Sequence, residues 1–163
     1  MGADYSDIIC VNKYPGNPAL FTTATTNYAH KPKIFRIAEM YLINAEAAAQ
    51  ISGSEATALS SLNAIRTARG LTALTGLTGT NLLNAVKEER TRELMFEGNR
   101  IDDLKRWKLG FERKTPQNIN IIVTGADYNQ KVVAAGDNKF VWGIPTNDIT
   151  TNPAIANQQN PGW

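Results

Sequence analysis

Residues 35–70 read FRIAEMYLINAEAAAQISGSEATALSSLNAIRTARG, and this stretch decides the fold. In its first half the apolar residues recur at the i, i+3, i+4, i+7 spacing of an amphipathic helix, which predicts a helix beginning after Pro32. They are Ile34, Ile37, Ala38, Tyr41, Leu42, Ala45, Ala48 and Ala49. The opposite side also carries Met40, Ile43 and Ala47. A helix that is apolar on two sides is expected to lie between two neighbours.

The second half of the stretch predicts another helix. The sequence SGSE at 52–55 has the pattern of a capping box, in which the Ser52 hydroxyl and the Glu55 side chain each bond the other's backbone amide. One face then carries Ala58, Leu59, Leu62, Ile65 and Ala68, and Gly70 stands where a left-handed C-terminal cap is expected. Two helices joined by so short a turn form an antiparallel hairpin. The positions of Tyr41, Ala45, Ala58 and Leu62 are similar to the tetratricopeptide pattern, but its Trp-Leu-Gly signature is missing.

Composition limits the class of protein. The chain has 163 residues, 42% of them hydrophobic and 20% charged, as expected for one globular domain with a core. Its 17 basic and 15 acidic residues nearly balance and form no basic run, which argues against a nucleic-acid partner or an anionic membrane surface. No stretch approaches the roughly 20 apolar residues that span a bilayer. With one cysteine, Cys10, and one histidine, His30, the chain predicts neither an internal disulfide nor a zinc site.

Glycine, proline and polar residues mark the boundaries of the remaining predicted elements. Residues 1–32 predict an irregular lead-in with a short strand near residues 7–11, and we interpret His30 as a surface loop residue. A third helix is predicted over 81–97 and a fourth over 101–109, separated by Gly98.

The last third of the chain has a weaker pattern. Residues 119–125 and 131–137 are either short strands or apolar loop anchors. The Pro- and Asn-rich segment 140–163 predicts an irregular tail held by its aromatic residues. The predicted fold is therefore mainly α, with tetratricopeptide-like helical hairpins, long irregular loops and one or two short strands, in a domain over residues 33–163.

The charged segment EERTRELMFEGNRIDDLKRW, residues 88–107, raises the question of catalysis. On a helical wheel of about 100° per residue, four of its charged residues fall on the apolar face with Leu82, Leu83, Val86, Leu94 and Phe96. These four are Glu89, Arg90, Glu93 and Glu97. Buried carboxylates must be paired, and arginine is the partner that meets a carboxylate with two hydrogen bonds. The nearby arginines are Arg36, Arg66, Arg69, Arg100 and Arg106.

Two catalytic interpretations fit less well. A di-iron helical bundle needs Glu-x-x-His pairs on helices, and the only histidine lies in a predicted loop. A glycosidase needs two carboxylates that face each other across a sugar, whereas successive turns of one helix do not oppose, and neighbouring arginines would keep both groups ionised. We therefore expect no catalytic residues, no metal and no cofactor.

Three tryptophans remain. Trp107, with Leu104, is expected to anchor the fourth helix. Trp142 and Trp163 have two interpretations: an aromatic residue can stack on a sugar face, or it can hold an irregular tail in place.

Four sequence blocks together resemble the SusD/RagB family of Bacteroidetes outer-membrane proteins. They are FRIAEMYLINAEAAAQ at 35–50, ALSSLNAIRTARG at 58–70, EERTRELMFEGNRIDDLKRW at 88–107 and WGIPTNDITTNPAIANQQNPGW at 142–163. The third and fourth blocks are specific, and their order and spacing agree with the C-terminal part of that family. The residues that fit the family motif are Glu89, Arg90, Glu93, Glu97, Arg100, Asp103, Arg106 and Trp107, and the resemblance implies that they form a structural ion-pair network and scaffold rather than a ligand site.

The resemblance also implies a function. Family members are surface lipoproteins without catalysis that bind oligosaccharides or other nutrients and pass them to a SusC-like TonB-dependent porin. The family's glycan-contacting aromatics lie mainly upstream of this region, and Cys10 does not match the lipidated cysteine, so both the main ligand site and the anchor are expected outside this chain. The alternative is a tetratricopeptide-like protein-interaction module that binds no ligand of its own.

Overall fold

A computed structural model describes residues 13–14, 16, 19, 32–114 and 132–163. The predicted strand near residues 7–11, the apolar run 119–125, Cys10 and His30 lie outside the described residues. The chain divides into two compact units, one containing Val11–Arg100 and the other containing Ile101–Trp163. Each unit is described by itself.

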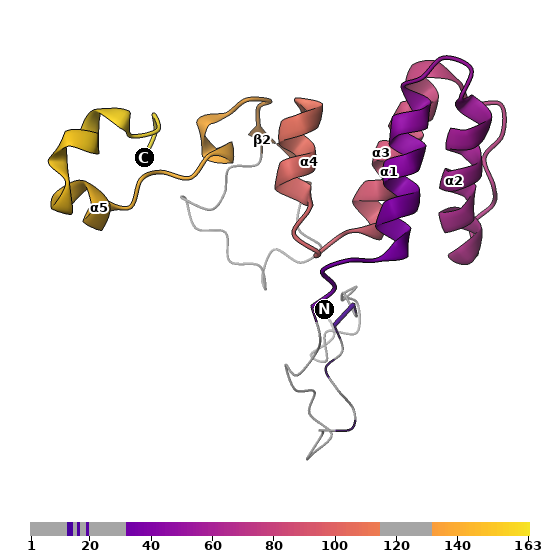
Figure 1. Cartoon of the computed structure of the whole chain (residues 1–163), viewed down its shortest axis with the longest axis horizontal. Helices are drawn as coiled ribbons and strands as arrows, with labels where there is room; N and C mark the ends of the chain where they lie inside the picture. The colour runs from indigo at the N-terminus through magenta and orange to yellow at the C-terminus, as the bar shows by residue number, and fades with distance from the viewer. Residues whose placement is uncertain (1–12, 15, 17–18, 20–31, 115–131) are drawn as a thin grey trace. The chain divides into compact units, whose positions relative to one another are not determined.

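The first unit is built on the predicted helical hairpin. Helix α1 spans Ile37–Ala49 and helix α2 spans Glu55–Ala68. The two helices run side by side in Figure 1, joined by a tight turn in which Gly53 has a positive φ. The sequence prediction of a mainly α-helical fold with such a hairpin is confirmed.

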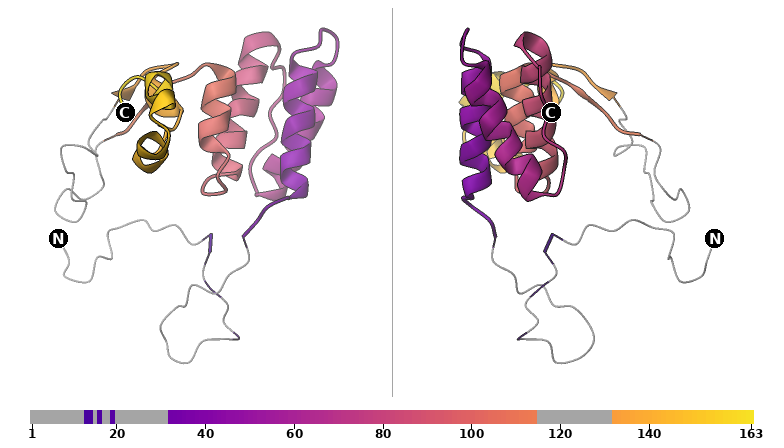
Figure 2. Two further views of the ribbon diagram at one scale, coloured as in Figure 1. Left: turned by 60° about the vertical axis from the view of Figure 1, so that its left-hand side comes forward. Right: turned by 90° about the vertical axis from the view of Figure 1, so that its right-hand side faces the viewer.

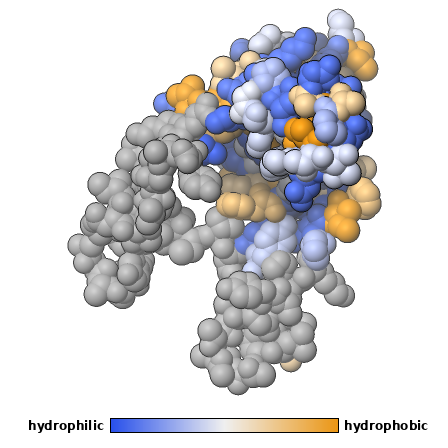
Figure 3. All heavy atoms as spheres, turned by 90° about the vertical axis from the view of Figure 1, so that its left-hand side faces the viewer, coloured by the Kyte–Doolittle hydropathy of each residue, from blue (hydrophilic) through white to orange (hydrophobic). Residues whose placement is uncertain are grey.

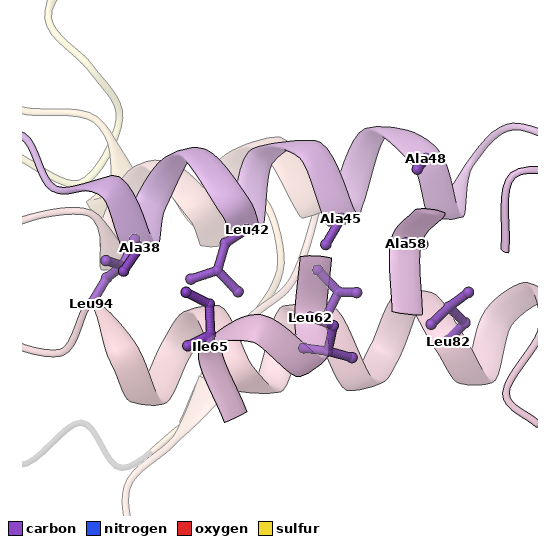
Figure 4. Close-up of a cluster of buried hydrophobic side chains, with 10 residues drawn as sticks. Ala38, Leu42, Ala45, Ala48, Ala58, Leu62, Ile65, Leu82 and Leu94 are labelled. Carbon is purple, nitrogen blue, oxygen red and sulfur yellow. The ribbon is translucent and has the colours of Figure 1, made fainter. Parts of the chain in front are cut away.

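Helix α3, Gly79–Glu93, completes a three-helix unit whose members lie alongside one another in both views of Figure 2. Period-3.6 apolar faces of the three helices meet in one cluster, shown in Figure 4. Alanines at the α1–α2 contact let the helix backbones come close, and leucines fill the space beside them. The buried members are Ala38, Leu42, Ala45 and Ala48 of α1, Ala58, Leu62 and Ile65 of α2, Leu82 and Val86 of α3, and Leu94.

The outer face of α1 differs from the prediction. We predicted that neighbours would cover both apolar sides of this helix, but Met40 and Ile43 are exposed. The residues placed at the start of the buried face also lie outside the core, because α1 begins only at Ile37, which is 73% exposed, and Ile34 precedes the helix. Among the described residues, α1 therefore buries one face and presents a second apolar face to solvent.

Helix ends were predicted with mixed success. At the C-terminus of α2, Gly70 has φ +73°. The amide of Leu71 donates to the Arg66 carbonyl, and that of Gly70 donates to the Thr67 carbonyl, as in a Schellman cap. The capping box was wrong: α2 begins at Glu55 after Ser54, whose side chain makes no capping hydrogen bond.

The predicted third helix was too long at its C-terminal end. Helix α3 stops at Glu93, and Phe96, which the wheel placed on the apolar face, has φ +63° and is 63% exposed. Glu97 therefore lies in the turn that follows the helix rather than on the helix itself.

The second unit contains shorter elements. Helix α4, Arg100–Trp107, is followed by strand β1, Phe111–Glu112, which pairs antiparallel with β2, Val132–Val133. The tail is less irregular than predicted, because it holds the 3₁₀ turn η3, Asn138–Phe140, the helix α5, Thr146–Thr151, and the 3₁₀ segment η4, Pro153–Gln158. On the face in Figure 3 the described residues are mainly hydrophilic. No described helix has the length and apolar character to cross a membrane.

Candidate functional site

The carboxylate of Glu93 joins the ends of three helices. Glu93 is the last residue of α3, Arg36 is the N-cap of α1, and Arg69 is the C-cap of α2. Arg69 donates from Nε to Oε2 at 2.9 Å and from Nη2 to Oε1 at 2.6 Å, and Arg36 Nη1 donates to Oε1 at 2.7 Å. The Glu93 side chain is 8% exposed. One bidentate and one further charge-assisted hydrogen bond thus fix the three helix ends to one another.

Glu97 extends this arrangement. Its Oε2 accepts from Arg36 Nε at 3.0 Å, and its Oε1 lies 2.9 Å from Arg36 Nη2 and 2.5 Å from Lys13 Nζ. Lys13 Nζ also donates to the carbonyls of Glu93 and Met95, at 2.9 and 2.7 Å. Carbonyls at the end of a helix have no partner within it, so the lysine satisfies groups that α3 leaves open. We call Lys13, Arg36, Arg69, Glu93 and Glu97 the arginine–glutamate cluster.

The cluster keeps both carboxylates ionised. Hydrogen bonds from Arg69, reinforced by Arg36, outweigh burial and lower the pKa of Glu93 from 4.5 to about 2. Burial alone raises the pKa of Glu97, but hydrogen bonds and charges of Arg36 and Lys13 outweigh it and lower that pKa overall. A general acid needs a pKa near the working pH. Neither carboxylate therefore suits proton donation.

Acid is expected to weaken the first unit through Glu93. Above pH about 4.5 its pairing contributes fully; between about 4.5 and 2 the unfolded chain takes up a proton that the folded chain resists, so the free energy of unfolding falls. Urea unfolding at several pH values in this window measures the slope of the free energy of unfolding against pH. Glu93→Gln removes the titrating group, and we expect its slope to be shallower. Equal slopes for the two proteins would contradict this assignment.

The other charged residues of the predicted network form separate pairs. Glu89, buried on α3, accepts from Arg66 at 2.8 Å and from Arg92 at 3.1 Å. Arg90 donates to Glu39 of α1 at 3.1 Å. These contacts connect α3 to each of its two neighbours.

Arg100 and Asp103 lie apart from those pairs. Arg100 donates to the Thr91 hydroxyl at 2.9 Å. In the second unit, Asp103 accepts from Arg106 one turn further along α4 at 2.9 Å, and the Arg106 guanidinium lies 4.7 Å from the centre of the Trp107 ring. The structure therefore places the seven predicted residues in several local arrangements rather than around one pocket. Among the described residues, no group of three or more His, Cys, Asp or Glu side chains has the arrangement of a metal site.

Sequence reasoning missed Lys13 and Glu39. Lys13 lies 80 residues before Glu93, in a region without a period, so no spacing rule connects the two. Glu39 stands in the first turn of α1. Because the helix dipole alone accounts for an acidic residue in that position, nothing in the sequence pattern indicated that Glu39 pairs with Arg90.

Trp142 and Trp163 form an exposed aromatic pair in the second unit. Their ring centres are 6.1 Å apart with the planes inclined by 42°. Trp142 is 82% exposed and Trp163 is 54% exposed. Gly143 lies so close to the Trp163 ring that a Cβ there would approach Cγ to 2.7 Å. The two rings thus pack on each other and on a glycine backbone while keeping large faces open to solvent.

Polar side chains near the C-terminus hold this pair in place. Gln159 spans the Ile144 backbone, accepting from its amide at 2.8 Å and donating to its carbonyl at 3.0 Å. Asn160 donates to the carbonyls of Asn138 and Val141 at 2.7 and 3.0 Å. The backbone on both sides of Trp142 and Gly143 is therefore tied to the segment that leads to Trp163. The tail is held by amide hydrogen bonds as well as by aromatic packing.

Comparison with known proteins gives a consistent result. The sequence profile of the SusD family matches residues 9–163. A SusD superfamily protein from Bacteroides vulgatus superimposes with a TM-score of 0.67 at 29% identity, over 87% of this chain and 30% of its own. A candidate sugar binding protein from the same organism gives a TM-score of 0.58 at 32% identity, over 80% of this chain and 28% of its own.

A SusD-like protein from Bacteroides fragilis is similar over 88% of this chain and 28% of its own, with a TM-score of 0.57 at 25% identity. The chain therefore spans less than a third of the length of each of these solved structures. No curated protein matches the sequence significantly.

Proposed function

The chain belongs to the SusD family, and on this premise we propose that it is part of a non-catalytic glycan-binding protein of the bacterial outer membrane. The single observation that carries the proposal is the family match over residues 9–163. Similarity at 32% identity to a candidate sugar binding protein supports a glycan as the ligand. Because the solved relatives are about three times longer than the part matched here, the proposed activity is that of the whole protein.

The proposal includes delivery of the captured glycan. In it, a surface lipoprotein passes its ligand to a SusC-like TonB-dependent porin. The arginine–glutamate cluster would act as a rigid frame and not as a reaction centre, since its carboxylates are held ionised by Arg36, Arg69 and Lys13. Co-purification of a TonB-dependent porin with the parent protein from outer membranes would support delivery. A parent protein that binds glycan but co-purifies with no porin would contradict delivery.

Within this chain, the Trp142–Trp163 pair is the proposed place for contact with sugar. An aromatic face left open to solvent and held by its neighbours is preorganised for stacking, because little conformational freedom is lost on binding. Among the described residues of the second unit the pair is the most exposed aromatic surface, and Gln159 and Asn160 fix the backbone around it.

Replacing Trp142 by alanine should weaken glycan binding about three- to tenfold, the loss of one stacking contact of about 1 kcal/mol. A glycan array identifies the ligand, and calorimetry on wild type and variant measures the affinity. Phe35→Ala is a matched control, because Phe35 is an equally exposed aromatic residue, 86% exposed, in the first unit. Equal losses of glycan affinity in the two variants would contradict the proposed role of Trp142 in stacking.

The absence of catalysis is tested with the same ligand. Incubation of the purified protein with each bound oligosaccharide should release no reducing sugar over many hours. Steady release that scales with protein concentration would overturn the proposal in favour of a glycosidase.

A second candidate function is supported by the outer face of α1. Its apolar residues, among them Ile37, Met40 and Ile43, are exposed in a row at helical spacing, as in tetratricopeptide-like modules that bind another protein. In that case the parent protein would capture a protein partner through this face and give no signal on a glycan array. A glycan signal unaffected by Ile37→Ser and Ile43→Ser would favour the first function.

A further inference from the structure

A pocket of about 470 Å³ opens in the second unit, between the last turn of α4 and the segment that follows β2. Its volume is in the range of small-ligand sites. Its lining includes Lys105 and Lys108 and an apolar wall of Phe140 and Val141. The remaining lining residues are Ala135, Gly136 and Asp137. A ligand here would meet both lysine side chains and apolar surface.

Within the described part of the chain, neither lysine forms an ion pair. Their α4 neighbours Asp103 and Arg106 pair with each other. Among residues 32–114 and 132–163, no carboxylate lies within ion-pair distance of Lys105 or Lys108. The carboxylate of Asp137 accepts from the Lys139 backbone amide at 2.8 Å. The pocket thus has two charges available to an anion and one carboxylate that is partly occupied.

Lys108 is held in a conformation that costs energy. Its φ is +54°, and its amide donates to the Lys105 carbonyl at 3.1 Å while that of Leu109 donates to Leu104 at 2.9 Å. Helices usually place glycine at this left-handed position, because a Cβ there lies too close to the following carbonyl oxygen. The helix dipole explains a lysine within the last turn, such as Lys105. It does not explain a strained lysine beyond the helix, and strain of this kind is concentrated at functional sites.

The apolar wall is fixed in place. Phe140 packs edge-on against Phe111 of β1, with ring centres 6.3 Å apart at 81°. Val141 is the residue directly before Trp142, and its carbonyl accepts from Asn160. The pocket is therefore continuous along the chain with the exposed aromatic pair. A sugar ring has one apolar face that suits Phe140 and Val141 and a polar rim that suits the lysines.

We propose that this pocket binds an acidic sugar, with the anionic group between Lys105 and Lys108 and the ring against Phe140 and Val141. This inference rests on the proposed glycan-binding function and specifies its ligand class, an oligosaccharide carrying a carboxylate or a sulfate. A charge-assisted hydrogen bond to an ammonium group is roughly twice as strong as a neutral one, so an acidic ligand should be preferred over its neutral counterpart.

The test uses the 163-residue chain with three probes: trigalacturonate, its carboxyl-reduced neutral form, and a sulfated trisaccharide. Calorimetry at low and moderate salt should show at least tenfold tighter binding of an acidic probe, weakening with salt. Comparison of the two acidic probes distinguishes carboxylate from sulfate. Lys105→Gln together with Lys108→Gln should abolish the preference while leaving the neutral probe unaffected. Lys114→Gln is the control, because Lys114 lies outside the pocket and is paired with Glu112.

A second variant guards against misfolding. Lys108→Gly relieves the left-handed strain, so its Tm should rise while its preference for the acidic probe falls. Equal affinity for acidic and neutral probes, or a preference that survives both lysine variants, overturns the acidic-sugar inference and leaves glycan binding standing. Failure of the 163-residue chain to bind any of the three probes also overturns the acidic-sugar inference, whereas failure of the whole parent protein to bind any glycan on the array overturns the proposed function itself.

Discussion

Replacing Glu93 by alanine should lower the free energy of unfolding by about 3 kcal/mol, the low end for breaking a buried ion pair. The carboxylate is 8% exposed and joins Arg36 to Arg69, so its loss leaves Arg69 without its carboxylate partner and Arg36 with Glu97 alone. Arg69 is half exposed and can turn to water, which keeps the cost at the low end. Urea unfolding at neutral pH, followed by circular dichroism, measures the difference.

A control on the same helix separates burial from charge. Glu88 is 70% exposed and lies 3.5 Å from Arg92, one turn away. Exposed pairs contribute at most about 1 kcal/mol, so Glu88→Ala should change stability by a few tenths. If the two alanine variants lose the same stability, Glu93 does not act as the joint between three helices. Glycan affinity should be unchanged in either variant wherever the protein remains folded.

The helical hairpin was predictable because its signals are local. The apolar period of residues 37–49 and Gly70 each act within a few residues, and the structure uses both. The two-residue strand within 131–137 was one of two interpretations of a short apolar run. The wheel also placed Glu89 and Arg90 on the face that the structure buries.

The remaining differences come from tertiary context. A wheel assumes that the helix continues, and it failed for Phe96 because α3 ends at Glu93. Glu97 is buried as predicted, with its side chain 4% exposed, but it lies in the turn after the helix. The period of α1 revealed two apolar sides but not whether a neighbour exists for each. The partners of Glu93 are set by where three helix ends meet, and Lys13 comes from a distant segment. The pocket beside Lys108 depends on the positive φ of that residue, which its residue type does not predict.

Leu62→Ala tests the core that the sequence pattern identified, and we expect a loss of about 3–4 kcal/mol in the free energy of unfolding. Leu62 is completely buried on α2 within the cluster that includes Leu42 of α1 and Leu82 of α3 (Figure 4). Its removal takes contacts from all three helices at once. The cavity would border alanines, such as Ala45 and Ala58, whose short side chains cannot reach in to fill it.

The matched control is Leu71→Ala, because Leu71 is 42% exposed and follows the C-terminal cap of α2. Its loss should be below about 1 kcal/mol, since little apolar surface leaves the interior. Domains are stable by only about 5–15 kcal/mol, so Leu62→Ala should also lower Tm by many degrees and expose the first unit to proteolysis. A Leu62 variant no less stable than the Leu71 variant would mean that the three helices do not pack around this side chain. Ion pairs at the helix ends would then have to hold the unit together, and Glu93→Ala would become the more damaging of the two substitutions.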